Sequence, residues 1–308
     1  MTATATPSQI GLVSRLVNGI LSIEPVYEFA KHQARQMMIK RAEKIGVPWR
    51  QEAEALRSQN LEAEFARVQN SSVIYPEYYL RSFHAYETGN LNWEAATELA
   101  VAAKAVHAKI WPEAGAQGDA KLRQSYHDLL KTQLPKIPND ILDLGCGVGL
   151  SSFSLQQVYP EAQVTGLDLS PHFLAVARHQ SQTHHTASPL RWVHAAAEET
   201  RLPDASFDLV SLFLVCHELP QSATRAILRE ARRLLRPTGH LGIMEMNPRS
   251  EVFAKMPPYI LTLLKSTEPY LDEYFSLDLA REIVEAGFEI PRIESNSPRH
   301  RTVIAGAK

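Results

Sequence analysis

The sequence predicts an α/β protein in which an all-helical region precedes a seven-stranded parallel sheet. After residue 138, short apolar runs alternate with helical stretches, which is typical of a parallel sheet covered by helices on both faces. Before residue 138, apolar residues recur at helical spacing, for example over residues 13–21, and such spacing indicates amphipathic helices. We therefore expect a helical domain or lid over residues 1–138 and a domain built on the sheet over residues 139–308.

The helical region is expected to begin with an amphipathic helix over residues 10–23. The central span of this helix carries only one cation, Arg15, whereas helices that lie on membranes carry many. A core or dimer-interface helix is therefore favoured over membrane docking, and a homodimer through the N-terminal helices is one expected assembly. Asn92 is placed to cap the helix that starts at Trp93. The remaining helices are expected over residues 26–46, 50–69, 93–109 and 121–133.

The second region is expected to hold the sheet. In such a sheet a ligand binds beyond the carboxyl ends of the strands, where the strand order reverses. The expected strands are Ile141–Leu144, Gln163–Leu167, Leu190–His194, Phe207–Phe213, His240–Met246, Phe288–Ile293 and Thr302–Ala305. The expected helices are Ser151–Val158, Pro171–Gln180, Ser222–Leu235 and Asp278–Ala286.

A glycine-rich turn follows the first expected strand. Residues 141–149 read Ile-Leu-Asp-Leu-Gly-Cys-Gly-Val-Gly, and glycine allows both positive φ and the close approach of a ligand. Asp168 ends the next apolar run, where a carboxylate can accept two hydrogen bonds from a ribose diol. Asp143 lies two positions before the first glycine, where its charge would repel a pyrophosphate but would suit a ligand that carries an ammonium group. Asp143 thus disfavours a dinucleotide oxidoreductase.

These motifs resemble those of the class I S-adenosylmethionine-dependent methyltransferases, in particular the ubiquinone/menaquinone-biosynthesis type. The matching segments follow the family's order and lie at residues 143–149, 167–171, 197–198, 202–210 and 234–241. The resemblance covers residues 139–308 and implies a Rossmann-like seven-stranded sheet. It also implies S-adenosyl-L-methionine as the cofactor and S-adenosyl-L-homocysteine as the product.

The resemblance further implies which residues bind the cofactor. Many relatives carry an aspartate immediately before the Ala-Glu pair, but Ala196 occupies that position here. Adenine recognition is then expected to rest on backbone groups or on Glu198. The expected cofactor-binding residues are Asp143, Gly145, Cys146, Gly147 and Leu214 for the methionine part, Asp168 for the ribose hydroxyls, and Leu169, Ala197 and Glu198 for the adenine.

The fourth expected strand delivers His217 and Glu218 to the mouth of the site, and both are expected to be catalytic. Because the unperturbed pKa of histidine lies near neutrality, His217 can deprotonate a hydroxyl or position an acceptor. Glu218 would orient the imidazole or bind a cationic acceptor. The structural alternative is that His217 bonds the loop backbone and that Glu218 caps or salt-bridges a helix.

Two aromatic clusters are candidates for the acceptor pocket. The first spans residues 75–93 and includes His84 and Tyr86, and the second spans residues 265–274 and includes Tyr270 and Tyr274. Aromatic rings suit a pocket wall or lid over a flat substrate. The alternatives are a packed helix–sheet interface for the first cluster and a solvated acidic loop for the second.

Composition narrows the possible partners. The net charge of −2 gives no general attraction to nucleic acid or anionic membranes. There is no apolar run of the roughly 18 residues that a membrane span needs. The two cysteines indicate no disulfide framework, and the N-terminal residues lack the features of a signal peptide. We expect a cytoplasmic protein without a metal site.

The sequence thus predicts an enzyme that methylates a small-molecule acceptor, most readily an aromatic or polyfunctional metabolite at oxygen or carbon. Two alternatives stay open. One is a methyltransferase acting on a protein side chain, with the helical region as the docking surface. The other is a non-catalytic cofactor-binding partner of another enzyme, in which His217 would be idle.

Overall fold

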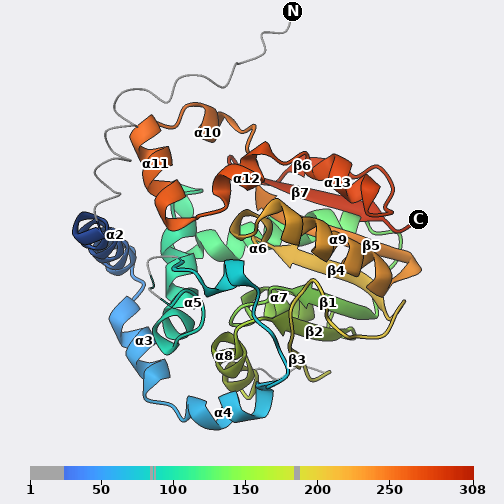
Figure 1. The fold of residues 1–308 in the computed structure, drawn as a ribbon, viewed down its shortest axis with the longest axis horizontal. Coiled ribbons are helices and arrows are strands. Elements are labelled where there is room, and N and C mark those ends of the chain that lie inside the picture. Colours follow the sequence, from blue (N-terminus) through green and yellow to red (C-terminus); the bar gives the residue numbers. More distant parts are fainter. Residues whose placement is uncertain (1–23, 84–85, 87, 184–187) are drawn as a thin grey trace, which may run out of the picture.

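A seven-stranded sheet forms the centre of the protein in our computed structural model, which describes residues 24–83, 86, 88–183 and 188–308 (Figure 1). The strand order is β3-β2-β1-β4-β5-β7-β6. Strands β1 to β5 run parallel, whereas β7 is antiparallel to both β5 and β6. The strands are β1 (Asp140–Leu144), β2 (Gln163–Asp168), β3 (Arg191–His194), β4 (Phe207–Phe213), β5 (Leu235–Met246), β6 (Arg292–Ser295) and β7 (His300–Gly306). The order reverses between β1 and β4, which places the expected ligand site at their carboxyl ends.

Helices cover both faces of the sheet because successive strand residues point to opposite sides. Ile141 packs with residues of α6 (Gly118–Gln133) and α7 (Leu150–Val158) on one face. The next residue, Leu142, packs with residues of α9 (Gln221–Leu234) and α13 (Leu279–Glu285) on the other. The helix after β2, α8 (Pro171–Ser181), is capped by Ser170, whose Oγ accepts from the backbone N–H of Phe173. The alternating pattern seen in the sequence therefore produces a three-layer arrangement.

The N-terminal helices gather beyond the end of the sheet where the parallel strands finish (Figure 1). They are α2 (Glu24–Lys44), α3 (Trp49–Arg57), α4 (Leu61–Val68) and α5 (Trp93–His107). The cap of α5 is confirmed, because the Asn92 side chain accepts from the Ala95 N–H at 2.8 Å. The helix expected over residues 10–23 lies outside the described residues.

The prediction of one helix over residues 50–69 is wrong, because the segment forms two helices, α3 and α4, with a non-helical stretch between them. The Ser58 hydroxyl and the Gln59 side-chain amide both donate to the carbonyl of Ala55, at 2.9 and 3.0 Å. Side chains that bond nearby carbonyls in this way compete with the helical backbone pattern. The expected strand over residues 288–293 is also displaced. Phe288 makes only an isolated bridge to Ala307, and β6 begins at Arg292.

The segment between β5 and α13 is helical rather than a loop. It contains α10 (Glu251–Ala254), α11 (Pro258–Thr267) and α12 (Leu271–Ser276). In addition, short 3-10 helices occur at η1 (Glu77–Leu80), η2 (Pro112–Gln117) and η3 (Cys216–Glu218). Of these, η1 and η3 lie beside the site described below.

Helix α6 joins the core of the sheet. Leu122 and Leu130 are fully buried and pack with Ile141 and Leu209, while the Tyr126 hydroxyl lies 2.9 Å from Ser211 Oγ on β4. The domain division at residue 138 stays a prediction, and this packing provides a way to test it.

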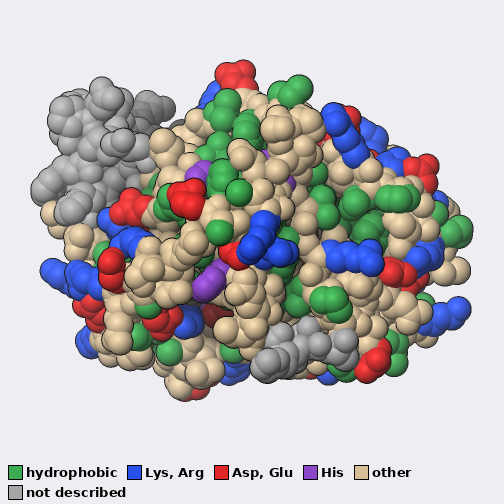
Figure 2. All heavy atoms as spheres, turned by 90° about the horizontal axis from the view of Figure 1, so that it is seen from below, with side chains coloured by type: hydrophobic (Ala, Val, Ile, Leu, Met, Phe, Trp, Pro, Cys, Tyr) green, Lys and Arg blue, Asp and Glu red, His purple; other side chains and the backbone are tan. Residues whose placement is uncertain are grey.

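The surface mixes charges of both signs. On the face in Figure 2, basic and acidic side chains are interspersed with apolar ones over the part that the structure describes. Among the described residues, no helix is long and apolar enough to cross a membrane.

Candidate active site

The glycine turn after β1 is hydrogen-bonded to the end of β2. The backbone N–H groups of Gly145 and Cys146 donate to the carbonyl of Leu167 at 2.8 and 3.0 Å. Gly145 has φ +71°, and a Cβ there would lie 2.8 Å from a methyl group of Val215. Both the backbone conformation and the space therefore require glycine at this position.

Trp192 on β3 packs against the same turn. A Cβ on Gly149 would lie 2.7 Å from the Trp192 ring, and a Cβ on Gly166 would lie 2.5 Å from it. The indole therefore lies directly on two glycines, one in the turn and one on β2. This contact joins β3 to the glycine turn.

Asp168 ends β2 and contacts the glycine turn, as expected from the sequence. One carboxylate oxygen accepts from the Gly147 N–H at 2.8 Å, and the other accepts from the Ser170 N–H at 2.7 Å. The residue is only 7% exposed, and burial raises the pKa of Asp168 to about 6 despite these hydrogen bonds. The turn and the carboxylate thus form one preorganised unit.

Asp143 lies within β1 and is completely buried. The hydroxyls of Ser151 and Ser152, both on α7, donate to its Oδ2 at 2.6 Å each. Its Oδ1 is buried without a hydrogen-bond partner among the described residues. Burial raises the pKa of Asp143 to about 6, although the serine hydroxyls and the charge of Arg123 act to lower it.

Sequence reasoning missed Arg123, a buried cation on α6 close enough to act on Asp143. Its guanidinium lies 4.4 Å from the centre of the Phe213 ring, and its Nε donates to Asp119 at 2.9 Å. Asp119 precedes it by four residues, so the pair lies on one helix face. That spacing was the available signal, but such pairs usually lie on the surface.

The expected adenine end is formed by the loops after β2 and β3. Leu169 is buried, and its carbonyl lies 3.1 Å from His194 Nε2. Ala197 is partly buried against the core. Glu198 accepts a hydrogen bond from the Tyr78 hydroxyl, and its second oxygen is buried without a partner among the described residues. Cys146 is buried, and burial raises the pKa of its thiol.

A tyrosine-rich segment, residues 75–80, reaches these loops from the helical region. The Tyr75 hydroxyl lies 3.3 Å from His194 Nε2, and the Tyr75 and Tyr79 rings stack with centroids 6.3 Å apart. The Tyr78 ring meets that of Tyr270 edge-on at 6.2 Å. Burial raises the pKa of Tyr79, and the negative charges of Asp168 and Glu218 raise it further. Tyr75, Tyr78 and Tyr79 were part of the aromatic cluster seen in the sequence but were not singled out there.

His217 lies in η3 beyond β4 and is paired with a carboxylate that the sequence analysis did not identify. Glu245 on β5 is fully buried and lies 2.8 Å from His217 Nδ1, and it also accepts from the His217 backbone N–H at 3.1 Å. Burial lowers the pKa of His217, but the Glu245 carboxylate outweighs this effect, and the pKa rises to about 9. Glu218 and Glu268 act in the same direction as Glu245.

Two of the four expected acceptor residues lie near His217 or near the tyrosine-rich segment. Tyr274 is buried with its ring 6.4 Å from that of His217, and its hydroxyl donates to the carbonyl of Met246 at 2.6 Å. Tyr270 is also buried and meets Tyr78 as described above. The solvated-loop alternative for residues 265–274 is therefore wrong at these two tyrosines.

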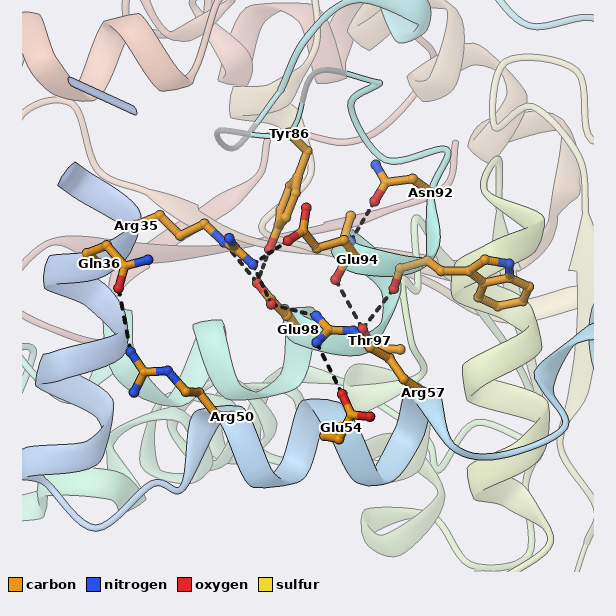
Figure 3. Close-up of polar contacts among 12 residues, drawn as sticks. Arg35, Gln36, Arg50, Glu54, Arg57, Tyr86, Asn92, Glu94, Thr97 and Glu98 are labelled. Carbon is orange, nitrogen blue, oxygen red and sulfur yellow. Dashed lines mark hydrogen bonds and ion pairs between the residues drawn. The ribbon is translucent and has the colours of Figure 1, made fainter. Parts of the chain in front are cut away.

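Tyr86, a third expected acceptor residue, is not part of this cluster. The Tyr86 hydroxyl donates to Glu98 on α5 at 2.9 Å (Figure 3), and His84 lies outside the described residues. Leu214 follows β4 with φ +59°, and its N–H donates to the carbonyl of Met244. A non-glycine residue in this conformation is held there by its surroundings.

Comparison with known proteins agrees with this geometry. A family model described as a methyltransferase domain matches residues 141–239. A ubiquinone biosynthesis O-methyltransferase of Xanthomonas euvesicatoria is 31% identical over 167 residues, which are 53% of this chain and 68% of that protein. The chain belongs to the class I S-adenosylmethionine-dependent methyltransferases. The chain is also 35% identical over 108 residues to a demethylmenaquinone methyltransferase of Chlamydia trachomatis. The match there spans 35% of this chain and 44% of that protein, less than half its length.

Solved structures share the fold of this methyltransferase. Phosphoethanolamine N-methyltransferase 2 of Haemonchus contortus, in complex with S-adenosyl-L-methionine, superposes with a TM-score of 0.52 at 16% identity. The alignment covers 78% of this chain and 61% of the Haemonchus chain. A protein from Pyrococcus horikoshii gives a TM-score of 0.51 at 17% identity, over 66% of this chain and 99% of that one. At such low identity these likenesses show the fold alone.

Proposed function

We propose that this methyltransferase transfers the methyl group of S-adenosyl-L-methionine to an oxygen or carbon atom of a small-molecule acceptor. The observation that carries the proposal is the arrangement of two buried carboxyl groups around one glycine turn. Asp143 and Asp168 reach this turn from neighbouring strands, and the Gly147 N–H donates directly to Asp168. The family membership supports the same cofactor.

The residues of the site fit this cofactor. The unpartnered oxygen of Asp143 suits the ammonium group of the methionine part, and the buried cation of Arg123 suits its carboxylate. Asp168 would accept from the ribose hydroxyls, as carboxylates at this place in related folds do. The unpartnered oxygen of Glu198 suits the amino group of adenine. Glu198 would then take the role of the aspartate that many relatives carry at the position of Ala196.

The cofactor supplies an electrophilic methyl group on a sulfonium, so the protein mainly has to align the acceptor and accept any proton that it loses. We assign proton acceptance to Nε2 of the neutral form of His217, which appears as the pH rises towards 9, since Nδ1 is engaged by Glu245. Glu245 fixes the orientation of the ring and stabilises the imidazolium that forms. Glu218 lies half-buried in the same 3-10 helix and contributes negative charge near both His217 and Tyr79.

Aromatic residues near the expected adenine end and near His217 support the acceptor class that we propose. Tyr78 contacts both Glu198 and Tyr270. Its ring therefore connects the expected adenine end to the second aromatic cluster, residues 265–274. The Xanthomonas relative is named for an O-methylation in ubiquinone biosynthesis. An aromatic or polyfunctional metabolite with a free hydroxyl or an activated carbon is therefore the acceptor that we propose.

Calorimetric titration with S-adenosyl-L-methionine and S-adenosyl-L-homocysteine, with NADH as a control ligand, tests the cofactor assignment. We expect Asp168→Ala to weaken binding of both sulfur ligands at least about tenfold, since a lost charge-assisted bond costs about 1.5–3 kcal/mol. Asp204→Ala is the matched control, because Asp204 is an exposed carboxylate paired with Arg233 on the surface. Unchanged binding in Asp168→Ala would overturn the assignment.

A measurement of turnover distinguishes a methyltransferase from a non-catalytic cofactor-binding protein. We expect His217→Ala to bind S-adenosyl-L-methionine like the wild type but to lose activity in an acceptor screen that includes small phenols and a protein extract. Normal activity in His217→Ala would return this residue to a structural role. Activity on the protein extract alone would favour a protein substrate.

A further inference from the structure

The outer edge of β6 is open. This strand is the last of the sheet, and β7 is the only described strand that pairs with it (Figure 1). All four of its residues, Arg292–Ser295, are exposed. A row of free backbone N–H and C=O groups at a sheet edge is a template for a further strand.

The ladder between β6 and β7 shows which backbone groups face this edge. The Asn296 N–H donates to the carbonyl of His300 at 3.3 Å, in the register of the β6–β7 pairing. Hydrogen-bonded and non-hydrogen-bonded pairs alternate along an antiparallel ladder. The backbone groups of Glu294 and Arg292, two and four positions before Asn296, therefore point to β7. Those of Ile293 point outwards.

The side chains of Arg292 and Glu294 lie on one face of the sheet, because successive strand residues point to opposite faces. It is the face that α6 covers, since Glu294 Oε1 accepts from Gln133 Nε2 on α6 at 2.6 Å. No described residue forms an ion pair with Arg292. The edge thus presents one cation and one anion, two positions apart and both exposed.

These two charges complement those of a second copy of the strand. Around a two-fold axis, the residue on the axis faces its own copy and the flanking residues face each other crosswise. With the axis at Ile293, Arg292 of each copy faces Glu294 of the other. With the axis at Arg292 or at Glu294, like charges face each other, and with the axis at Ser295, Glu294 faces the neutral Asn296.

Charge therefore favours the register centred on Ile293. Charged side chains usually protect an edge strand from pairing, but opposite charges directly across a ladder stabilise it and like charges destabilise it. In this register β6 forms two opposite-charge pairs with its own copy.

The backbone favours the same register. Because the N–H and C=O of Ile293 point outwards, Ile293 can exchange two hydrogen bonds with its own copy. Arg292 and Glu294 then form the non-hydrogen-bonded pairs, in which the Cα atoms are only about 4.5 Å apart and the side chains are closest. The Ile293 side chains, each 43% exposed, would meet on the other face of the sheet.

We propose that two copies of this chain form a homodimer in which their sheets join edge to edge through β6, in the antiparallel register centred on Ile293. This interface differs from the one expected through the N-terminal helices. It includes none of the residues that we expect to bind the cofactor or the acceptor, so the proposal is independent of the proposed methyl transfer.

Sedimentation equilibrium of the full chain over a range of concentrations tests the dimer. We expect the mass to approach twice the 34.5 kDa of one chain as the concentration rises. Arg292→Glu and Glu294→Arg each put like charges into both pairs, and each should raise the dimer dissociation constant at least about tenfold. An equimolar mixture of the two variants should dimerise like the wild type, because every facing pair between the two chains is again of opposite charge.

Two further variants separate the interface from general effects. Arg229→Glu makes the same change of charge at an exposed position on α9 and should dimerise like the wild type. Ile293→Pro removes an outward N–H without breaking the β6–β7 ladder, and proline is tolerated at such edge positions, so this variant should be a folded monomer. A wild type that stays monomeric, a dimer that Arg292→Glu does not weaken, or a mixture that does not regain dimerisation would overturn the proposal.

Discussion

Asp143 and Asp168 are both buried, and burial raises the pKa of each to about 6. The native state therefore binds more protons than the unfolded chain between the unfolded pKa of 3.8 and about pH 6. Each carboxylate consequently lowers the free energy of unfolding as the pH rises through this window. The two carboxylates that we expect to bind the cofactor thus lower the free energy of unfolding of the cofactor-free protein at neutral pH.

For Asp143 this cost can be removed by substitution. We expect Asp143→Asn to raise the free energy of unfolding of the cofactor-free protein at pH 8 by up to about 3 kcal/mol, at 1.36 kcal/mol per pKa unit. The gain should shrink towards pH 4, where the wild-type carboxyl is protonated. Ser151 and Ser152 can still donate to the amide oxygen, so packing is retained.

Urea denaturation at the two pH values measures this effect. Calorimetry on the same variant should show weaker binding of S-adenosyl-L-methionine, because the carboxylate that we propose to bind the ammonium group is gone. A loss of stability at pH 8 would contradict the account of Asp143.

Glu245 controls the protonation of His217. With the pKa of His217 at about 9, the neutral base forms only as the pH rises towards 9, so we expect kcat/KM to rise over that range. In Glu245→Gln the attraction is lost while burial still lowers the pKa, and the rise should move to a lower pH. The pH dependence of kcat/KM measures this shift.

Glu113→Gln removes an exposed carboxylate paired with Lys121 and should leave the profile unchanged. A wild-type rate that falls above pH 9 would instead assign His217 the role of a cation that positions the acceptor. The same pKa has a consequence for stability. The contribution of the His217–Glu245 pair is fully present below pH 6.5 and is lost as the pH rises through about 9.

At the scale of single residues, the sequence predicted the residues of the glycine turn but not the residues that lie close to the site from other elements. Asp143 and Asp168 stand next to recognisable turns, so their positions could be predicted. Glu245 lies 28 residues after His217 and meets it only because β5 pairs with β4. Arg123 and Tyr79 come from the helical region, and sequence spacing does not show which of its side chains face the sheet.

At the scale of the elements, the glycine turn after β1 leaves little room for a larger residue at Gly145. We expect Gly145→Ala to lower the free energy of unfolding by about 1–3 kcal/mol more than Gly46→Ala does, because a methyl group there meets Val215. Gly46 is the matched control, since it has φ +83° but nothing within 4 Å of a built Cβ. It therefore reports the cost of the left-handed conformation alone, about 1–2 kcal/mol.

Thermal and urea unfolding of both variants provide the comparison, with calorimetry for the cofactor. Gly145→Ala should also lose S-adenosyl-L-methionine binding, and Gly46→Ala should keep it. Equal losses of stability in the two variants would mean that Val215 moves aside at little cost.

Elements with a strong periodic signal were predicted within a few residues, as β1, β4 and α5 show. The short helices α10 and α12 were not, because four to six residues are too few to show a helical period. The break between α3 and α4 was missed for a different reason. It depends on hydrogen bonds from Ser58 and Gln59 to one carbonyl, which compete with helical propensity over a stretch of helix-forming residues.

For the whole molecule, the packing of α6 tests the division at residue 138. A fragment of residues 139–308 lacks Leu122, Tyr126 and Leu130, all buried against the sheet. Truncating one such side chain costs about 2–5 kcal/mol, and a typical domain is stable by only about 5–15 kcal/mol. We expect this fragment not to unfold cooperatively, whereas residues 118–308 should. Urea denaturation of the two fragments decides, and a cooperative transition in residues 139–308 would support the division at 138.

The overall arrangement could be predicted only in part. Alternating strands and helices indicate a parallel sheet, but they do not give the order of the strands, which only the structure shows. The placement of the helical region beyond the carboxyl ends of the strands depends on long-range contacts such as that between Tyr75 and His194, and local sequence carries no signal for them.

The packing of Trp192 on Gly149 and Gly166 gives the protein an optical reporter. Indole emission depends on the polarity and mobility of its surroundings, and this ring rests on the turn that we expect to close around the cofactor. Occupation of the turn should therefore change the fluorescence spectrum of the unlabelled protein. The other three tryptophans lie at residues 49, 93 and 111 and supply a constant background. Binding kinetics could then be followed in a stopped-flow instrument with no dye and no methyl acceptor.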